Sequence, residues 1–220
     1  MRTVIFDMDG VLFDTERLCQ DSWIVVAGER GLPGMEEVFP RCIGLNANDS
    51  RQVVLDAYGR DFDYEGFRKR ASQWFWEYVE ENGLPMKPGV RELLGWLKEN
   101  GWTVGLASST RGESVGKCLE RAGIRECFEV VVTGDVVEHS KPLPDIYLLA
   151  CSRLGAAPAE SYAIEDSPNG IRSAHAAGMH PLMVPDMIAP DEEMRRLSEK
   201  IFDSLNDVLA FFQESSGKGK

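Results

Sequence analysis

From about residue 88 onward, short apolar runs alternate with segments whose apolar residues recur every three or four positions. Val90, Leu93, Leu94 and Leu97 give the first such segment one apolar face, which predicts a helix. The pattern then predicts strands over 103–107, 129–132, 162–164 and 181–184, with helices around 115–122, 144–154 and 168–177. Apolar strands that alternate with helices are typical of a parallel sheet covered on both faces, and residues 3–6 are expected to join this sheet.

Residues 15–85 break this alternation and are expected to be helical without strands. Aromatic residues near the end of this segment share one helical face, which we interpret as core packing, whereas Trp76 lies off that face and is expected to be exposed. The face consists of Phe67, Ala71, Trp74, Phe75, Tyr78 and Val79. The predicted organisation is an α/β Rossmann-like core of residues 1–14 and 86–214, a helical insertion of residues 15–85, and a disordered tail of residues 215–220.

The composition narrows the class of protein. A chain of 220 residues that is 43% apolar can build one sizeable core and a smaller satellite domain. The formal net charge of −12 argues against a nucleic-acid-binding surface, because such surfaces are usually basic. The five cysteines are odd in number and lack C-x-x-C spacing, so we expect reduced thiols, mostly in the core. No apolar run approaches the roughly 20 residues of a membrane span, and we expect a cytoplasmic protein, monomeric by default.

The stretch FDMDGVLFDTE, residues 6–16, places several acidic residues directly after the first predicted strand. Ionised carboxylates repel one another, and they are costly to desolvate beside a core. A turn at the Asp9-Gly10 dipeptide explains Asp9 but not Asp7. A cation held between the carboxylates would explain both aspartates.

Polar residues also follow three later strands, at the edge where open parallel sheets bind ligands. They are Ser108, Ser109 and Thr110; then Lys141; and then Glu165, Asp166 and Ser167. Each has a simpler explanation when taken alone, since the hydroxyls and Asp166 suit helix caps and Lys141 suits a solvated loop. Taken together, they indicate a site for a metal and a phosphate. The chain lacks the P-loop, the G-x-G-x-x-G fingerprint and the G-x-S-x-G elbow.

These residues resemble four motifs of the haloacid dehalogenase superfamily, in its beta-phosphoglucomutase-like phosphatase and phosphomutase branch. The first motif, D-x-D-G-V-L-F-D-T, is residues 7–15, and the second is Ser108 in Leu-Ala-Ser-Ser. The third is Lys141 in S-K-P-L-P-D, and the fourth is E-D-S-P-N-G at residues 165–170. The resemblance covers nearly the whole chain, and it implies that the helical insertion is that family's mobile cap.

The resemblance also implies a role for each residue. Asp7 would attack phosphorus and form an aspartyl phosphate, while Asp9 would act as general acid and base and offer its backbone carbonyl to Mg²⁺. Lys141 would be catalytic as well as phosphate-binding. The implied phosphate-binding residues are Ser108, Ser109 and Lys141, and the implied Mg²⁺ ligands are Asp7, Asp9, Glu165 and Asp166.

The same resemblance helps to distinguish between the reactions that members of this family catalyse. A carboxylate at Asp9 is expected of members that act on phosphate esters rather than of dehalogenases or phosphonatases. Mutases of this branch carry an arginine and a histidine where this sequence has Ala47 and Cys19, although Arg41 or Arg51 could substitute for the arginine. The expected function is Mg²⁺-dependent hydrolysis of a small phosphorylated metabolite. A sugar phosphomutase and a non-catalytic phosphate-binding or interaction protein are the alternatives.

Overall fold

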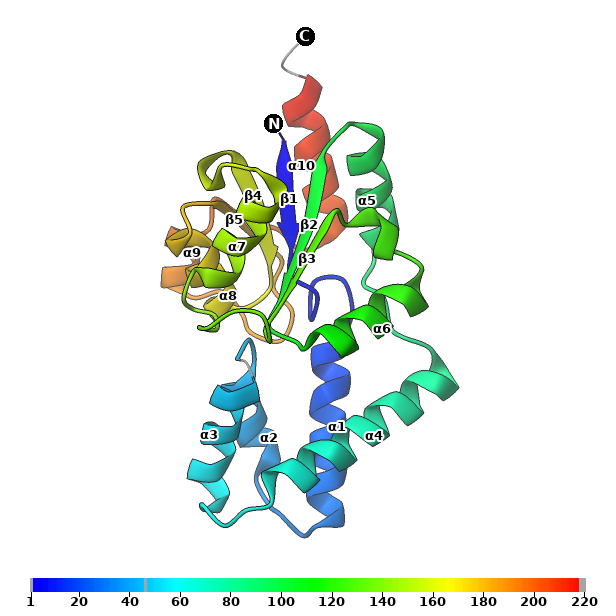
Figure 1. Ribbon diagram of the computed structural model, residues 1–220, viewed down its shortest axis with the longest axis vertical. Coiled ribbons are helices and arrows are strands. Elements are labelled where there is room, and N and C mark those ends of the chain that lie inside the picture. The colour runs from blue at the N-terminus through cyan, green and yellow to red at the C-terminus, as the bar shows by residue number, and fades with distance from the viewer. Residues whose placement is uncertain (1, 46, 218–220) are drawn as a thin grey trace.

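The computed structural model describes residues 2–45 and 47–217, and a parallel sheet lies at the centre of its larger part (Figure 1). The six strands lie in the order β3-β2-β1-β4-β5-β6, and neighbouring strands run parallel. β1 (Thr3–Phe6) pairs with β2 (Thr103–Ser108) on one side and with β4 (Ser161–Glu165) on the other. The α/β Rossmann-like fold is confirmed, and the carboxyl end of β1 lies at the middle of one sheet edge.

Helices follow most strands, as the alternating pattern predicts. The remaining strands are β3 (Val130–Thr133), β5 (His180–Met183) and β6 (Lys200–Ile201). The helices of the sheet part are α5 (Val90–Glu99), α6 (Gly112–Ala122), α7 (Asp145–Leu154), α8 (Pro168–Ala176), α9 (Glu192–Leu197) and α10 (Leu205–Gly217).

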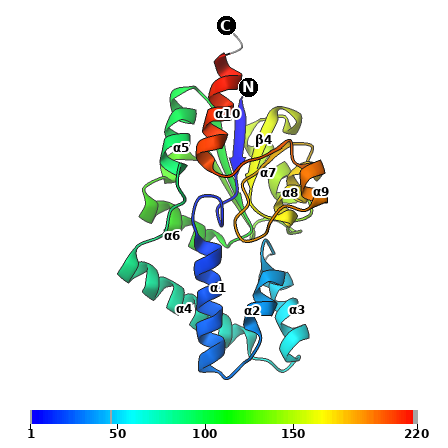
Figure 2. The same ribbon diagram turned by 180° about the vertical axis from the view of Figure 1, so that it is seen from behind.

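The sheet is buried on both faces because successive strand residues point to opposite sides. Val4 and Phe6 pack into a cluster with residues of α5, α6 and α10, whereas Ile5 packs on the other face with residues of α7 and α8. The view from behind shows α5 and α10 side by side over one face (Figure 2). Burial on both faces explains why the strands are apolar at consecutive positions.

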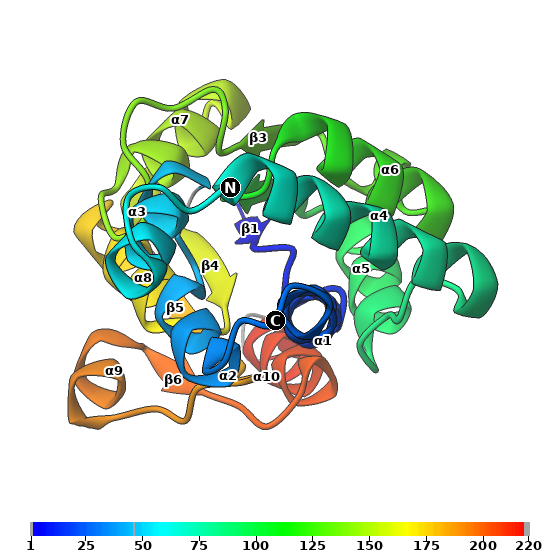
Figure 3. The same cartoon turned by 90° about the horizontal axis from the view of Figure 1, so that it is seen from below.

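Residues between β1 and α5 form a helical insertion with a core of its own. Its helices are α1 (Thr15–Glu29), α2 (Met35–Val38), α3 (Ala47–Tyr58) and α4 (Tyr64–Asn82), with a 3₁₀ turn at Phe39–Cys42. Trp23 is 2% exposed and makes edge-to-face contacts with Phe39 at 5.2 Å and Phe67 at 5.5 Å. Seen from below, the insertion lies across the end of the sheet part that carries the strand carboxyl ends (Figure 3).

The two chain crossings between the insertion and the sheet part are paired with each other. The Asp14 N–H donates to the Pro85 carbonyl at 2.9 Å, and the Lys87 N–H donates to the Leu12 carbonyl at 2.9 Å. Phe13 and Met86 form a β-bridge between these two hydrogen bonds. The insertion is therefore attached through one narrow two-stranded ribbon.

The exposure expected for Trp76 is wrong. Trp76 is half-buried against the core of the sheet part, and the charged groups of Lys117 and Arg121 each lie 5.6 Å from its ring centre. Tyr78, expected on the buried face, is instead 39% exposed. The reason is that α4 packs against the other helices of the insertion along one side and contacts α6 of the sheet part along another.

The carboxyl terminus also differs from the expectation. α10 continues to Gly217, so residues 215–217, expected to be disordered, are helical; residues 218–220 lie outside the described residues. Burial of Leu205, Val208 and Phe212 against the sheet anchors this helix. All five cysteines are free thiols, as expected. No helix within residues 2–45 or 47–217 has the length and apolar character needed to cross a membrane.

Candidate active site

The carboxyl end of β1 holds Asp7 at the centre of the sheet edge. The Asp7 N–H donates to the Ile164 carbonyl at 2.9 Å, which extends the pairing of β1 with β4 by one residue. The chain then turns at Gly10, whose φ of +78° suits glycine, and the Gly10 N–H donates to the Phe13 carbonyl at 2.8 Å. This turn places Asp7 and Asp9 in the wall of one cavity.

Lys141 is buried rather than solvated, with 2% of its side chain exposed. Its ammonium donates to Asp7 Oδ1 at 2.5 Å, to Glu165 Oε1 at 2.7 Å and to the Ala107 carbonyl at 3.1 Å. Burial favours the neutral amine, but the attraction of the two carboxylates outweighs this and raises the pKa of Lys141. Lys141 is therefore a charged group that fixes Asp7 and Glu165 relative to each other.

Asp7, Glu165 and Asp166 form a buried carboxylate cluster, with one oxygen of each within 4.8 Å of those of the other two. Burial, opposed by Lys141 but assisted by Glu165 and Asp9, raises the pKa of Asp7 to about 8. Burial and the nearby charges of Glu16, Glu165 and Asp7 likewise raise the pKa of Asp166. One lysine does not balance this negative charge, and an oxygen-only donor set fits a hard divalent cation.

Three hydroxyl groups hold the side chain of Asp9. Thr15 Oγ1 donates to Asp9 Oδ1 at 2.5 Å, and Thr110 Oγ1 donates to Asp9 Oδ2 at 2.8 Å. Ser108 is fully buried, and its Oγ lies 3.4 Å from Asp9 Oδ2. The Asp9 carboxylate is thus oriented by hydroxyls and lies outside the cluster of three carboxylates.

The alternative explanation of the fourth motif as a helix cap applies to Ser167. Ser167 Oγ accepts a hydrogen bond from the Gly170 N–H at 3.1 Å and caps α8. Asp166 does not cap the helix, and it lines the cavity with a side chain that is almost fully buried. In the sequence Glu-Asp-Ser, the first two residues thus belong to the carboxylate cluster and the third caps α8.

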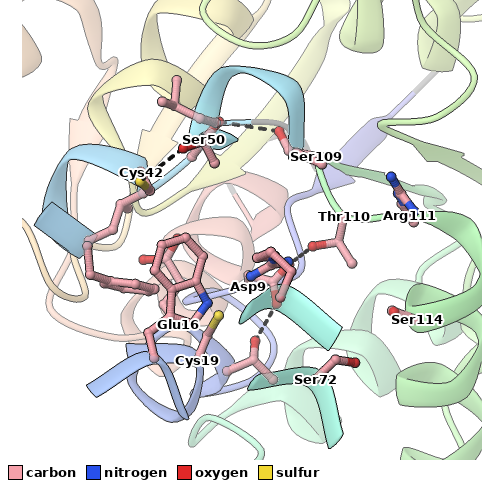
Figure 4. Close-up of a pocket in the computed structure, with 18 of the residues that line it drawn as sticks. Asp9, Glu16, Cys19, Cys42, Ser50, Ser72, Ser109, Thr110, Arg111 and Ser114 are labelled. Atoms are coloured by element: carbon pink, nitrogen blue, oxygen red, sulfur yellow. Dashed lines mark hydrogen bonds between the residues drawn. The ribbon is translucent and has the colours of Figure 1, made fainter. Parts of the chain in front are cut away.

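A cavity of about 550 Å³ separates the sheet edge from the helical insertion. Asp7, Asp9 and Lys141 line its floor, and Figure 4 shows Thr110 directed at Asp9, with Ser109 and Arg111 in the same wall. The cationic residues that line the cavity are Arg51, Arg68, Lys69, Arg111 and Lys117. With Lys141 they equal in number the acidic residues of the lining, so the cavity is close to charge-balanced in an otherwise acidic protein; those acidic residues are Asp7, Asp9, Glu16, Glu65, Glu113 and Asp166.

Some residues of the site carry no signal in the sequence. Tyr147 looks like an ordinary core residue of α7, yet its hydroxyl donates to Glu165 Oε1 at 2.6 Å. Arg68 lies on α4, and its guanidinium sits 5.0 Å over the Trp23 ring at the cavity wall. Thr110 follows the expected Ser108-Ser109 pair, and its contact with Asp9 was not predicted. Only the adjacency of Thr110 to the second motif hints at its position.

Gly10→Ala is expected to weaken divalent-cation binding at the cluster by at least about tenfold. An added Cβ would lie 2.2 Å from Asp166 Oδ2, and a left-handed backbone costs a non-glycine residue roughly 1–2 kcal/mol. Isothermal titration with Mn²⁺ measures the affinity. Gly95→Ala is the control, because no atom lies within 4 Å of its added Cβ and alanine favours the helix. Equal Mn²⁺ affinity in the two variants would contradict the expected steric coupling.

Known proteins resemble this chain over most of its length. A family model described as haloacid dehalogenase-like hydrolase matches residues 1–178. A phosphorylated carbohydrates phosphatase of Thermotoga maritima is 36% identical over 183 residues, which are 81% of this chain and 82% of that protein. A beta-phosphoglucomutase of Bacillus subtilis is 30% identical over 216 residues, 94% of this chain and 95% of that protein.

Among solved structures, CbbY from Rhodobacter sphaeroides in complex with phosphate superposes with a TM-score of 0.79 at 25% identity. The superposition covers 94% of this chain and 95% of that one. The family model spans most of the chain, and the relatives match it over most of their own length. The chain therefore belongs to the haloacid dehalogenase-like hydrolases.

Proposed function

We propose that this protein is a Mg²⁺-dependent phosphatase that hydrolyses a small phosphorylated carbohydrate through an aspartyl phosphate on Asp7. The observation that carries the proposal is the placement of Asp7, which contacts Lys141, borders two further carboxylates and opens into a cavity lined with cations. The phosphatase and mutase relatives support the reaction class and the type of substrate.

Asp7 is the proposed nucleophile. Lys141 occupies Asp7 Oδ1, so Oδ2 forms the new bond to phosphorus while the bond to the leaving oxygen breaks. Asp7, Glu165, Asp166 and the Asp9 carbonyl would hold Mg²⁺, which would supply positive charge that keeps Asp7 ionised and reduces its repulsion of the phosphate. The Lys141 ammonium stabilises the phosphoryl oxygens as negative charge moves onto the leaving group.

Asp9 is the proposed general acid and base. It gives a proton to the leaving alkoxide in the first step, and its carboxylate then takes a proton from the water that attacks the aspartyl phosphate. Thr15 and Thr110 orient it for both steps through their hydrogen bonds to its two oxygens. Ser108 and Ser109 are proposed to bind the phosphoryl group, and Ser108 reaches that position if its hydroxyl turns from Asp9.

The helical insertion is proposed to close over the substrate as a cap. Ser140 Oγ donates to Asp49 Oδ2 at 2.5 Å, and Ser109 Oγ donates to the Gly44 carbonyl at 3.4 Å, so the insertion touches the sheet part near the start of α3. The paired ribbon at Asp14 and Pro85 supplies a defined hinge. Closure excludes bulk water while the phosphoryl group is transferred.

A sugar phosphomutase is the second candidate function, and the arginines that line the cavity support it. Cys19 and Ala47 line the cavity where a mutase of this branch carries a histidine and an arginine, but Arg51 and Arg68 line it as well. A mutase must grip the distal phosphate of a bisphosphate, and either arginine can supply that charge. We place hydrolysis first because Arg51 is half-exposed and paired with Glu65 at 3.9 Å, and because the Arg68 guanidinium lies over the Trp23 ring at 5.0 Å.

Supplying beta-glucose 1-phosphate, a trace of the 1,6-bisphosphate and Mg²⁺ tests the choice between the two reactions. A hydrolase releases phosphate, because a weakly held bisphosphate leaves before it can reorient. Coupled assays follow inorganic phosphate and glucose 6-phosphate separately. Faster formation of glucose 6-phosphate than of phosphate would overturn the hydrolase proposal, and loss of that isomerisation in Arg51→Ala would identify the gripping residue. A panel of phosphorylated sugars and polyols then locates the preferred substrate.

Chelation tests whether activity requires Mg²⁺, and pH tests whether Asp7 is one of its ligands. EDTA is expected to remove activity, and Mg²⁺ is expected to restore it. Because Asp7 has a pKa of about 8 in the cation-free site, it carries a proton below that pH that an incoming cation must displace. Cation affinity should therefore rise with pH, by up to about tenfold per unit between about pH 6 and pH 8. Titration calorimetry in two buffers of different ionisation enthalpy measures how many protons are released when the cation binds. A cation affinity that does not vary with pH would contradict the assignment of Asp7 as a ligand.

A further inference from the structure

Glu16, Asp166 and Asp186 form a second carboxylate cluster, which shares Asp166 with the cluster around Asp7. One oxygen of each of the three side chains lies within 4.8 Å of those of the other two. Glu16 lies in the first turn of α1, Asp166 follows β4, and Asp186 follows β5. The cluster thus joins the base of the helical insertion to two loops of the sheet part.

Asp186 presents one oxygen with no hydrogen-bond partner. Its side chain is 3% exposed, and its Oδ1 accepts from Lys87 Nζ at 2.6 Å and from Arg17 Nη2 at 3.2 Å. Its Oδ2 is buried and makes no hydrogen bond. Both cations therefore act on one oxygen of Asp186, and the second oxygen is left to another positive group.

Glu16 has the same deficit at one oxygen, although its side chain as a whole is partly exposed and lines the cavity. Its Oε2 is buried and has no hydrogen-bond partner, and no lysine or arginine within residues 2–45 and 47–217 pairs with its carboxylate. Lys141, the buried cation of the site, donates to Asp7 and Glu165 instead. A buried carboxylate oxygen without a hydrogen-bond partner destabilises the folded state. Two buried carboxylate oxygens without partners in one cluster indicate a site for a positively charged ligand.

We propose that Glu16, Asp166 and Asp186 bind a second divalent cation, bridged through Asp166 to the cation at Asp7. Three carboxylates with no nitrogen or sulfur donor suit a hard ion such as Mg²⁺, Mn²⁺ or Ca²⁺. A carboxylate shared between two ions is a normal feature of two-metal centres. Since Glu16 belongs to the insertion, the second ion ties the first turn of α1 to the sheet part.

Mn²⁺ titration of the full chain tests this site. The wild type is expected to bind two ions per chain, and the second ion should alter the electron paramagnetic resonance signal of the first through Asp166. Glu16→Gln keeps the size of the side chain but removes its charge, and it is expected to bind one ion without that change of signal. Asp186→Asn is a second variant with the same expected result. Glu113→Gln is the control, because Glu113 lines the cavity outside both clusters and pairs with Lys117, and it should still bind two ions.

Two results would overturn the proposal. If the wild type binds a single ion per chain, the orphaned oxygens of Glu16 and Asp186 are neutralised by protons instead. If both variants still bind two ions, the second ion lies elsewhere. Neither result contradicts the proposed phosphatase function, because that function requires only the cation at Asp7 and the aspartyl phosphate on Asp7.

Discussion

Asp7→Asn is expected to reduce turnover of a phosphate ester by at least about a thousandfold while the fold survives. The asparagine amide keeps the shape of the carboxylate but cannot form an acyl phosphate, so the covalent route is lost entirely. The backbone hydrogen bond from residue 7 to the Ile164 carbonyl does not involve the side chain and should persist. Phosphate release from p-nitrophenyl phosphate with Mg²⁺ measures the loss, and circular dichroism with thermal unfolding verifies the fold.

The neighbouring Asp14 provides the matched control for Asp7. It belongs to the same acidic stretch, but its carboxylate pairs with Arg17 at 3.3 Å beside the linker ribbon and lies outside the cavity lining. Asp14→Asn should retain activity within about tenfold of the wild type, because it removes only partly exposed ion pairs, with Arg17 and with Lys87. If Asp7→Asn kept more than about a tenth of wild-type activity, covalent catalysis by Asp7 would be ruled out.

Lys141→Met is expected to lower the free energy of unfolding by about 3–5 kcal/mol in addition to abolishing activity. The methionine fills most of the space, but Asp7 and Glu165 lose the ammonium they share at 2.5 Å and 2.7 Å. Two buried carboxyl groups are then left without a cation, although Glu165 keeps the hydrogen bond from the Tyr147 hydroxyl. For a chain of this size such a loss lowers Tm by roughly 6–20 °C. Urea unfolding measured in EDTA gives the value without the contribution of a bound metal.

The pH dependence distinguishes this electrostatic cause from poor packing. Without Lys141, the folded-state pKa of Asp7 rises further, so the variant regains stability as pH falls and Asp7 takes up a proton. The gap between variant and wild type should therefore narrow toward acid pH. Lys98→Met is the control, since Lys98 is exposed on α5 and its replacement should change stability by less than about 0.5 kcal/mol. A Lys141→Met gap that is small, or constant with pH, would contradict the account.

The strand–helix alternation was sufficient to predict the parallel sheet, because apolar period and strand length are local properties of the sequence. Asp7 and Lys141 were predictable as candidates for the same reason, since the carboxyl ends of neighbouring parallel strands meet at one edge. Their roles in the reaction remain predictions. The short β6 and α9 were missed, because two to six residues are too few to establish a period.

Features that depend on docking between elements were not predictable from local pattern. Trp76 was expected to be exposed because it lies off the apolar face of α4, but that helix packs against two units and buries a second face. Tyr147 has the spacing of a core residue, and only the packing of α7 on the sheet brings its hydroxyl to Glu165. Glu16 belongs to the acidic stretch after β1, yet its neighbour Asp186 is 170 positions away and only the fold joins them.

The central claim, covalent transfer of the phosphoryl group to Asp7, is tested most directly by trapping the intermediate. The enzyme is mixed with Mg²⁺ and a preferred phosphorylated sugar, quenched in the steady state and reduced with borohydride, which converts an aspartyl phosphate to homoserine. Mass spectrometry of the peptide that spans Asp7 then reads the modified position. The account predicts homoserine at position 7 when substrate and Mg²⁺ are both present, and none when EDTA replaces Mg²⁺. Unmodified Asp7 in a sample that releases phosphate at its full steady-state rate would contradict it.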